Sequence, residues 1–115
     1  MSGQPSRVTT HVLDAVSGRP AAGVEVFLHH DEHGSWTELA TGRTDDDGRI
    51  TSFGPADLEP GVYRVSFAVA PYFASNGQQA FYPEVVIAFN LTDPDAHYHV
   101  PLLLSPYAFS TYRGS

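Results

Sequence analysis

Apolar and polar side chains alternate with a period of two along most of this chain, and this pattern restricts the fold more than any other feature. It is clearest at residues 61–69, where Tyr63, Val65, Phe67 and Val69 share one face and polar or small residues fill the positions between them. Successive side chains of a β-strand point to opposite faces of a sheet. The segment is therefore predicted to be a strand with one buried face.

The same alternation, interrupted by turn residues, predicts about eight short strands. Ten glycines and nine prolines punctuate the chain, and the acidic turn at residues 45–48 ends in a glycine suited to a positive φ. The expected strands span residues 8–13, 24–29, 36–41, 49–53, 61–69, 84–91, 97–104 and 107–113, with a turn at 17–20 and a short helical turn at 71–76. Many short strands with almost no helix indicate an all-β, antiparallel β-sandwich.

Length and charge limit the classes of function. The 115 residues are enough for one compact domain, which we expect at residues 8–115 after a flexible, polar N-terminus at 1–7. The net charge of -7 leaves no basic stripe for nucleic acid. No apolar stretch approaches a membrane span or a signal peptide, and cysteine is absent. We therefore expect a cytoplasmic protein with no nucleic-acid or membrane partner, no disulfide and no thiolate site.

Alternation also separates the two faces of the last strands. Tyr98, Val100, Leu102 and Leu104 are expected in the core, and the other face carries His97, His99, Pro101 and Leu103. In the first strand, His11 shares a face with Thr9 and Leu13. Both faces of the final two strands are thus apolar or aromatic, which in a small domain favours a subunit interface.

Histidines and arginines are the side chains most able to carry chemistry here. Paired imidazoles at His97 and His99, joined by His11, can supply a base and an acid near neutral pH. An arginine beside them, such as Arg49 or Arg113, can bind an anion or stabilise an oxyanion.

Less specific interpretations of the same residues remain open. His-X-His also has the same-face geometry of a zinc site, with His11 as third ligand, although a lone strand histidine is more often structural. His29, His30 and His33 are expected to lie in a solvated, charged loop segment. Residue types alone therefore leave the function undecided.

Several separated motifs resemble those of the transthyretin-like 5-hydroxyisourate hydrolases. The C-terminal run HYHVPLLLSPYAFSTYRGS (97–115) is similar to their signature, and its last four residues, YRGS, are missing from transthyretin, the hormone carrier. The segments TTHVLD (9–14), GRPAAG (18–23), TDDDGR (44–49) and FYPEV (81–85) match in the same order. The resemblance covers residues 8–115.

This resemblance implies an eight-stranded antiparallel transthyretin-like sandwich with one short helix. It also implies edge-to-edge dimers that stack into a homotetramer, with the active sites in the channel between dimers. The implied catalytic residues are His11, Arg49, His99 and Ser115, and the implied substrate-binding residues are His97, Tyr112 and Arg113.

The implied reaction is the hydrolysis of 5-hydroxyisourate to 2-oxo-4-hydroxy-4-carboxy-5-ureidoimidazoline in urate breakdown, without metal or other cofactor. His99, together with His11, is assigned to water activation and proton transfer, and Arg49 to the substrate oxygen. One alternative is a transthyretin-like small-ligand carrier, in which lysine, glutamate and threonine replace His11, Arg49 and His99 respectively. Another is a zinc-dependent hydrolase that uses His11, His97 and His99. An adhesive or carbohydrate-binding module has only the fold class in its favour.

Overall fold

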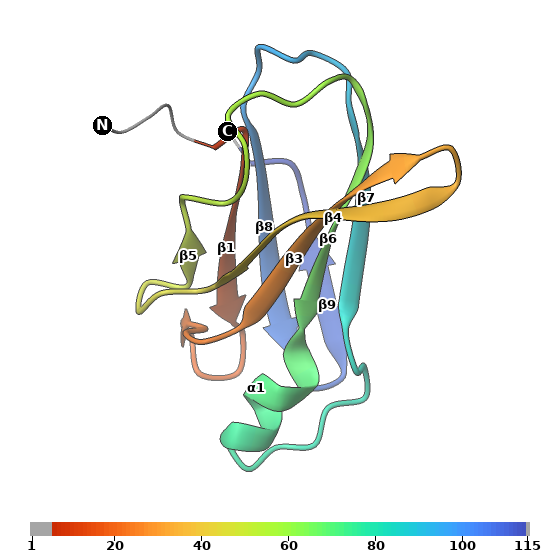
Figure 1. Ribbon diagram of the computed structural model, residues 1–115. Helices are drawn as coiled ribbons and strands as arrows, with labels where there is room; N and C mark the ends of the chain where they lie inside the picture. The colour runs from red at the N-terminus through yellow and green to blue at the C-terminus, as the bar shows by residue number, and fades with distance from the viewer. Residues whose placement is uncertain (1–5, 115) are drawn as a thin grey trace.

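Two β-sheets pack face to face in the computed structural model, which describes residues 6–114, and a short helix lies at one end (Figure 1). One sheet contains β1 (Val8–Asp14), β2 (Arg19–Pro20), β5 (Arg49–Ile50), β8 (Tyr98–Ser105) and β9 (Ala108–Thr111). The other contains β3 (Glu25–Glu32), β4 (Ser35–Arg43), β6 (Gly61–Ala68) and β7 (Val85–Leu91), and the helix is α1 (Val69–Ser75). The predicted β-sandwich with one short helix is confirmed.

The strand order is β2-β1-β8-β9 in the first sheet, with β5 also paired to β1, and β4-β3-β6-β7 in the second. Every pairing is antiparallel except that of β1 with β8, which is parallel. The prediction that all strands pair antiparallel was therefore wrong for this one pairing. The two strands lie at opposite ends of the chain, so no hairpin turn imposes an antiparallel direction on them.

The core lies between the inner faces of the two sheets. Side chains at every second position of β1, β3, β6 and β8 are almost fully buried there, as the alternation predicted. The core residues of these four strands are Val8, Val12, Val26, Leu28, Tyr63, Val65, Phe67, Tyr98, Val100, Leu102 and Leu104. Interdigitation of such inward-facing residues holds the two layers of a β-sandwich together.

Several element boundaries differ from the sequence prediction, and three of the differences lie at β2, β5 and α1. Arg19–Pro20, expected in a turn, pairs with Leu13 and Asp14 as the short strand β2. The strand expected at 49–53 is reduced to Arg49–Ile50. The helix begins at Val69 rather than at residue 71. Pro71 fits inside its first turn, where backbone N–H groups have no helical partner.

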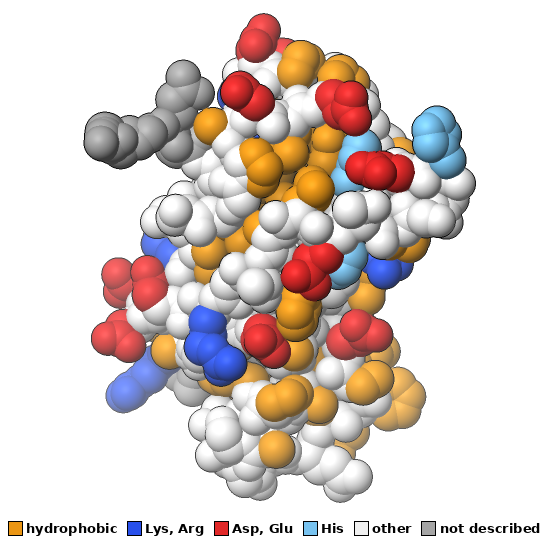
Figure 2. Space-filling model, in the orientation of Figure 1, with side chains coloured by type: hydrophobic (Ala, Val, Ile, Leu, Met, Phe, Trp, Pro, Cys, Tyr) orange, Lys and Arg blue, Asp and Glu red, His pale blue; other side chains and the backbone are white. Residues whose placement is uncertain are grey.

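His29 and His30 belong to β3 and not to a solvated loop, so that expectation was wrong. His30 is 8% exposed, and its ring stacks on Tyr63 with 4.4 Å between centroids. The two-residue period carries it to the same inner face as Leu28. Of the three histidines, His33 alone lies in the turn, with a φ of 57°. Figure 2 shows histidine side chains on and beside the hairpin formed by β3 and β4, among acidic groups.

The N-terminal boundary also differs from the prediction. Ser6 is 5% exposed and its hydroxyl accepts a hydrogen bond from the N–H of Phe53 at 3.0 Å. The Arg7 guanidinium donates from Nε to the carbonyl of Ala56 at 3.1 Å. These two residues are therefore part of the packed domain, whereas residues 1–5 lie outside the described range. Within residues 6–114, no helix is long and apolar enough to cross a membrane.

Candidate active site

The outer face of the β1–β8 sheet brings the predicted histidines and Arg49 together. His11 on β1 is the cross-strand partner of Arg49 on β5, and Thr9 on β1 is the partner of His99 on β8. His11 and His99 are half-buried, while Arg49 and His97 are exposed. Three strands that are distant in sequence thus place imidazole and guanidinium groups on one face, as alternation predicted for the histidines.

The hydroxyl of Thr9 joins two of these imidazoles. Its Oγ1 lies 2.8 Å from Nε2 of His97 and 2.8 Å from Nδ1 of His99. Thr9 itself is 9% exposed, and both contacts are partly buried. Each hydrogen bond uses one ring nitrogen, so Thr9 on β1 fixes the orientation of both imidazole rings.

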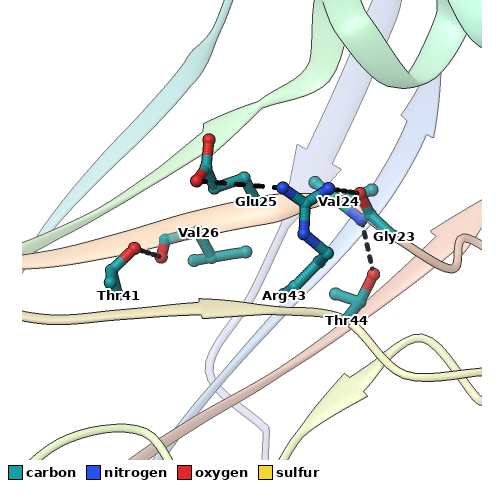
Figure 3. A network of polar contacts seen from close by, with 7 residues as sticks. All are labelled: Gly23, Val24, Glu25, Val26, Thr41, Arg43 and Thr44. Atoms are coloured by element: carbon teal, nitrogen blue, oxygen red, sulfur yellow. Dashed lines mark hydrogen bonds and ion pairs between the residues drawn. The ribbon is translucent and has the colours of Figure 1, made fainter.

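The chain that leads to Arg49 is fixed by polar contacts of Arg43 and Thr44, where β4 ends (Figure 3). The buried hydroxyl of Thr44 accepts a hydrogen bond from the N–H of Val24 at 2.8 Å and donates to the carbonyl of Ala21 at 2.7 Å. The preceding Arg43 donates from Nη1 to the carbonyl of Gly23 at 3.2 Å. The chain that leads to β5 is thereby tied to the segment between β2 and β3.

The turn between Thr44 and Arg49 completes this support. Asp45 Oδ1 accepts the N–H of Arg49 at 3.0 Å, and the carbonyl of Gly48 accepts the N–H of Val12 at 2.7 Å. Gly48 has a φ of 74°, and a β-carbon there would collide with the carbonyl oxygen of Val12. The glycine that the sequence analysis singled out is therefore required both by conformation and by close approach.

The electrostatic environment of His99 favours its neutral form. Burial is the largest cause that lowers the pKa of His99 below its ordinary value of 6.5, and Coulombic repulsion by His97, His11 and Arg49 lowers it further. Both effects oppose the addition of a proton to this imidazole. At neutral pH, His99 can thus accept a proton from water while a permanent positive charge lies close to it.

The C-terminal segment closes against His99 through Gly114. Its N–H donates to the carbonyl of His99 at 2.9 Å, in an isolated β-bridge. The neighbouring Arg113 donates from Nη2 to the carbonyl of His97 at 3.4 Å, and its guanidinium carbon lies 4.5 Å from the ring centroid of Tyr98. Ser115, the remaining predicted catalytic residue, lies outside the described residues.

Tyr112 lies beside a different cavity. This cavity, of about 180 Å³, opens between β7 and the end of β9, and Arg113 also lines it. Its remaining walls are Ile87, Phe89, Asn90, Tyr98, Val100 and Thr111. In the single chain, the C-terminal residues that contact the histidines are therefore Gly114 and Arg113. The role of Tyr112 in substrate binding stays a prediction.

The zinc site that residue spacing left open is not assembled. Among residues 6–114, no three His, Asp or Glu side chains are grouped so that they could hold a metal ion. Nε2 of His97 and Nδ1 of His99 instead converge on the hydroxyl of Thr9. The arrangement suits acid–base chemistry beside a fixed cation rather than metal coordination.

Comparison with known proteins agrees with this geometry. The family model described as the HIUase/Transthyretin family matches residues 8–114. The chain belongs to the HIUase/transthyretin family. A curated relative, the 5-hydroxyisourate hydrolase of Salmonella typhimurium, is 48% identical over 109 residues, which cover 94% of this chain and 80% of that protein.

Solved structures of the HIUase/transthyretin family share this fold. The 5-hydroxyisourate hydrolase of Klebsiella pneumoniae has a TM-score of 0.85 and 36% identity, covering 96% of this chain and all of that one. Transthyretin from Sparus aurata has a TM-score of 0.88 and 32% identity, covering 94% and 96% of the two chains. Fold likeness thus spans enzymes and transthyretins, so function has to be argued from the site.

Two residues of this family site were missed by the sequence analysis. Thr9 was placed on the face of His11 but given no role, and Gly114 appeared only as part of the C-terminal motif YRGS. Thr9 lies two residues from His11 on the same strand, so the two side chains share a face, and this could have drawn attention to Thr9. Its contact with His99 depends on the parallel pairing of β1 with β8, for which no local signal exists.

Proposed function

We propose that this protein hydrolyses 5-hydroxyisourate to 2-oxo-4-hydroxy-4-carboxy-5-ureidoimidazoline, a step of urate breakdown in purine degradation. The observation that carries the proposal is the convergence of His11, Arg49 and His99 on one sheet face, through the register pairs of β1 with β5 and β8. Curated relatives named 5-hydroxyisourate hydrolase support it across 94% of the chain.

The chemistry follows from the charges and pKa values of these groups. His99, assisted by His11, removes a proton from water, and the resulting hydroxide adds to the C6 carbonyl of the substrate. The Arg49 guanidinium stabilises the oxyanion that forms. When the N1–C6 bond breaks, the proton held by the imidazoles passes to N1, so that one water is consumed and the ring opens to a carboxylate.

The residues around this centre complete the proposed site. We assign His97, Tyr112 and Arg113 to substrate binding, and Ser115 to orientation of water or substrate at the rim. The contact of Gly114 with His99 supports this assignment, because it brings the end of the chain to the proposed base.

A homotetramer built as a dimer of dimers forms the second part of the proposal. Large apolar side chains on β7, β8, β9 and the adjoining loops are exposed in the single chain. They are Phe81, Val86, Leu103, Tyr107, Phe109 and Tyr112. Exposed apolar groups of this number favour burial between copies. A cytoplasmic location stays a prediction.

A ligand carrier is the competing function, since transthyretins share the fold. A carrier needs no neutral imidazole beside a guanidinium, and the lowered pKa of His99 favours catalysis. The test is an absorbance assay on freshly generated 5-hydroxyisourate, with and without a chelator. The hydrolase proposal expects turnover that the chelator leaves unchanged. Binding without turnover would indicate a carrier, and activity lost to the chelator and restored by zinc would indicate a metal enzyme.

A further inference from the structure

Among residues 6–114, Thr9 is the one residue of the site face whose hydroxyl contacts two of the clustered histidines. It lies opposite His99 on the parallel strand β8, and it is 9% exposed. Its Oγ1 lies at hydrogen-bond distance, 2.8 Å, from both Nε2 of His97 and Nδ1 of His99. The two imidazoles are therefore linked through a single hydroxyl group.

The number of protons on this hydroxyl limits how the two bonds form. A hydroxyl has one proton to donate and two lone pairs with which to accept. When Thr9 donates to one ring nitrogen, the other bond holds only if the second nitrogen carries a proton. With both rings neutral, either Nδ1 of His99 donates to Thr9 and Thr9 donates to Nε2 of His97, or both bonds run in the opposite direction.

The two arrangements differ in the chemistry left to His99. The first leaves Nε2 of His99 with an unshared electron pair, so that this nitrogen can act as a base. The second places a proton on Nε2, which can then only donate. The tautomer of an imidazole is set in this way by the hydrogen bond that its other nitrogen makes.

We propose that Thr9 is a positioning residue for hydrolysis, which holds His99 with Nδ1 protonated and Nε2 unprotonated and passes the proton gained by His99 on to His97. The inference rests on the proposed function, because it takes His99 as the base.

The proton steps balance without any further reactant. Nε2 of His99 takes a proton from water, and the Nδ1 proton of His99 moves to Oγ1 of Thr9. At the same time the original hydroxyl proton of Thr9 moves to Nε2 of His97. The hydroxyl is restored, and His97 holds the positive charge until the reverse transfer returns the proton for the departing nitrogen. His97 is exposed whereas His99 is half-buried, so solvation favours the charge on His97.

Two substitutions separate the hydroxyl from the shape of the side chain. Thr9→Val keeps a β-branched side chain suited to a strand but removes the hydroxyl, and Thr9→Ser keeps the hydroxyl. Thr10→Val is the matched control. Thr10 is the next residue, faces the core, and donates its hydroxyl to the carbonyl of Val100 at 2.6 Å.

We expect Thr9→Val to lower kcat by about 10- to 100-fold, as is typical when the orienting partner of a functional imidazole is lost. Thr9→Ser and Thr10→Val should stay within a few-fold of the wild type. Nitrogen NMR of the His99 ring should show protonated Nδ1 and unprotonated Nε2 in the wild type, with the Nε2-protonated form increasing in Thr9→Val. A purely structural role for Thr9 would not move these ring signals.

The opposite results are equally clear. Wild-type turnover in Thr9→Val, unchanged ring protonation in that variant, or an equal loss in Thr10→Val would each overturn the role of Thr9. Absence of turnover in the wild type would instead overturn the proposed function. The ring-nitrogen measurement would then still decide whether Thr9 sets the tautomer of His99, since it needs no substrate.

Discussion

Gly114 lies directly against the imidazole ring of His99. A β-carbon added to Gly114 would lie 2.5 Å from Cδ2 of that ring, well inside the normal separation of nonbonded carbon atoms. The two residues are also bonded through the backbone, from the Gly114 N–H to the His99 carbonyl at 2.9 Å. Any side chain at position 114 must therefore displace either the C-terminal segment or the proposed base.

The Gly114→Ala substitution tests this contact. We expect kcat/KM to fall by about a hundredfold, because a displacement of about 1 Å at a reacting group has an effect of that size. Gly77→Ala is the control. Gly77 has a φ of 72° with open space around it, so alanine there should cost about 1–2 kcal/mol of stability and leave kcat/KM unchanged. Full activity in Gly114→Ala would contradict a role for the close approach.

Removal of the proposed base or cation should abolish most activity while the fold remains. We expect His99→Asn to lower kcat by about 10²–10⁴-fold, as for loss of a general base. Arg49→Glu should lower it by at least about 10²–10³-fold, as for loss of an oxyanion donor. Steady-state kinetics and circular dichroism on the same samples separate loss of chemistry from loss of structure.

Histidines of the β3–β4 hairpin supply the controls for that experiment. His33→Asn should be near wild type in activity and stability, because His33 is exposed and asparagine tolerates its positive φ. His30→Asn should lower stability, since the buried ring stacks on Tyr63, but should spare kcat. A loss of kcat in His33→Asn as large as that in His99→Asn would refute the assignment of the site face.

The pH dependence of turnover should reflect the lowered pKa of His99. An imidazole of ordinary pKa, 6.5, becomes protonated as pH falls through that value, whereas His99 stays neutral to lower pH. The acid limb of kcat/KM is therefore expected to lie below 6.5, in a profile recorded from about pH 5 to about pH 8. An acid limb at or above 6.5 would show that another group is the base.

The lowered pKa of His99 also makes the free energy of unfolding depend on pH. Below pH 6.5 the unfolded chain binds a proton at His99 that the folded protein does not yet bind. This group therefore reduces the free energy of unfolding as pH falls from 6.5 towards the folded pKa. Urea unfolding at fixed protein concentration should show a weaker pH dependence over this range in His99→Asn than in the wild type.

Oligomeric state can be tested directly. We expect a tetramer at micromolar concentration, because the exposed side chains of Leu103, Phe109 and Tyr107 lie on or beside the last two strands. Sedimentation equilibrium or light scattering measures the mass. Phe109→Glu should shift the protein towards smaller species, since a carboxylate in an apolar interface loses its hydration without a partner. A wild-type monomer would rule out this assembly.

Deletion of residues 113–115 tests the C-terminal segment as a whole. Terminal residues can usually be trimmed without harm. Here Arg113 contacts the carbonyl of His97 and Gly114 contacts His99, so we expect turnover to be lost while the tetramer persists. Full activity in the deletion would show that these residues merely end the chain.

Local patterns were sufficient for the fold class and for the face on which the histidines lie. Two-residue alternation identified the buried sides of the strands that carry His11 and His99, because side-chain direction in a strand depends only on parity. The acidic turn at residues 45–48 identified Gly48, whose positive φ follows from its place at the end of that turn. Motif resemblance then selected His11, Arg49 and His99 from that face.

Pairing between distant strands was decided only by the tertiary structure. The parallel register that sets Thr9 against His99 joins residues 90 positions apart, and the pairing of His11 with Arg49 depends on a strand of only two residues. Register is set by the packing of whole sheets, not by any short segment. For the same reason His30 appeared solvated in sequence: its acidic neighbours are local, whereas Tyr63, which buries it, belongs to another strand.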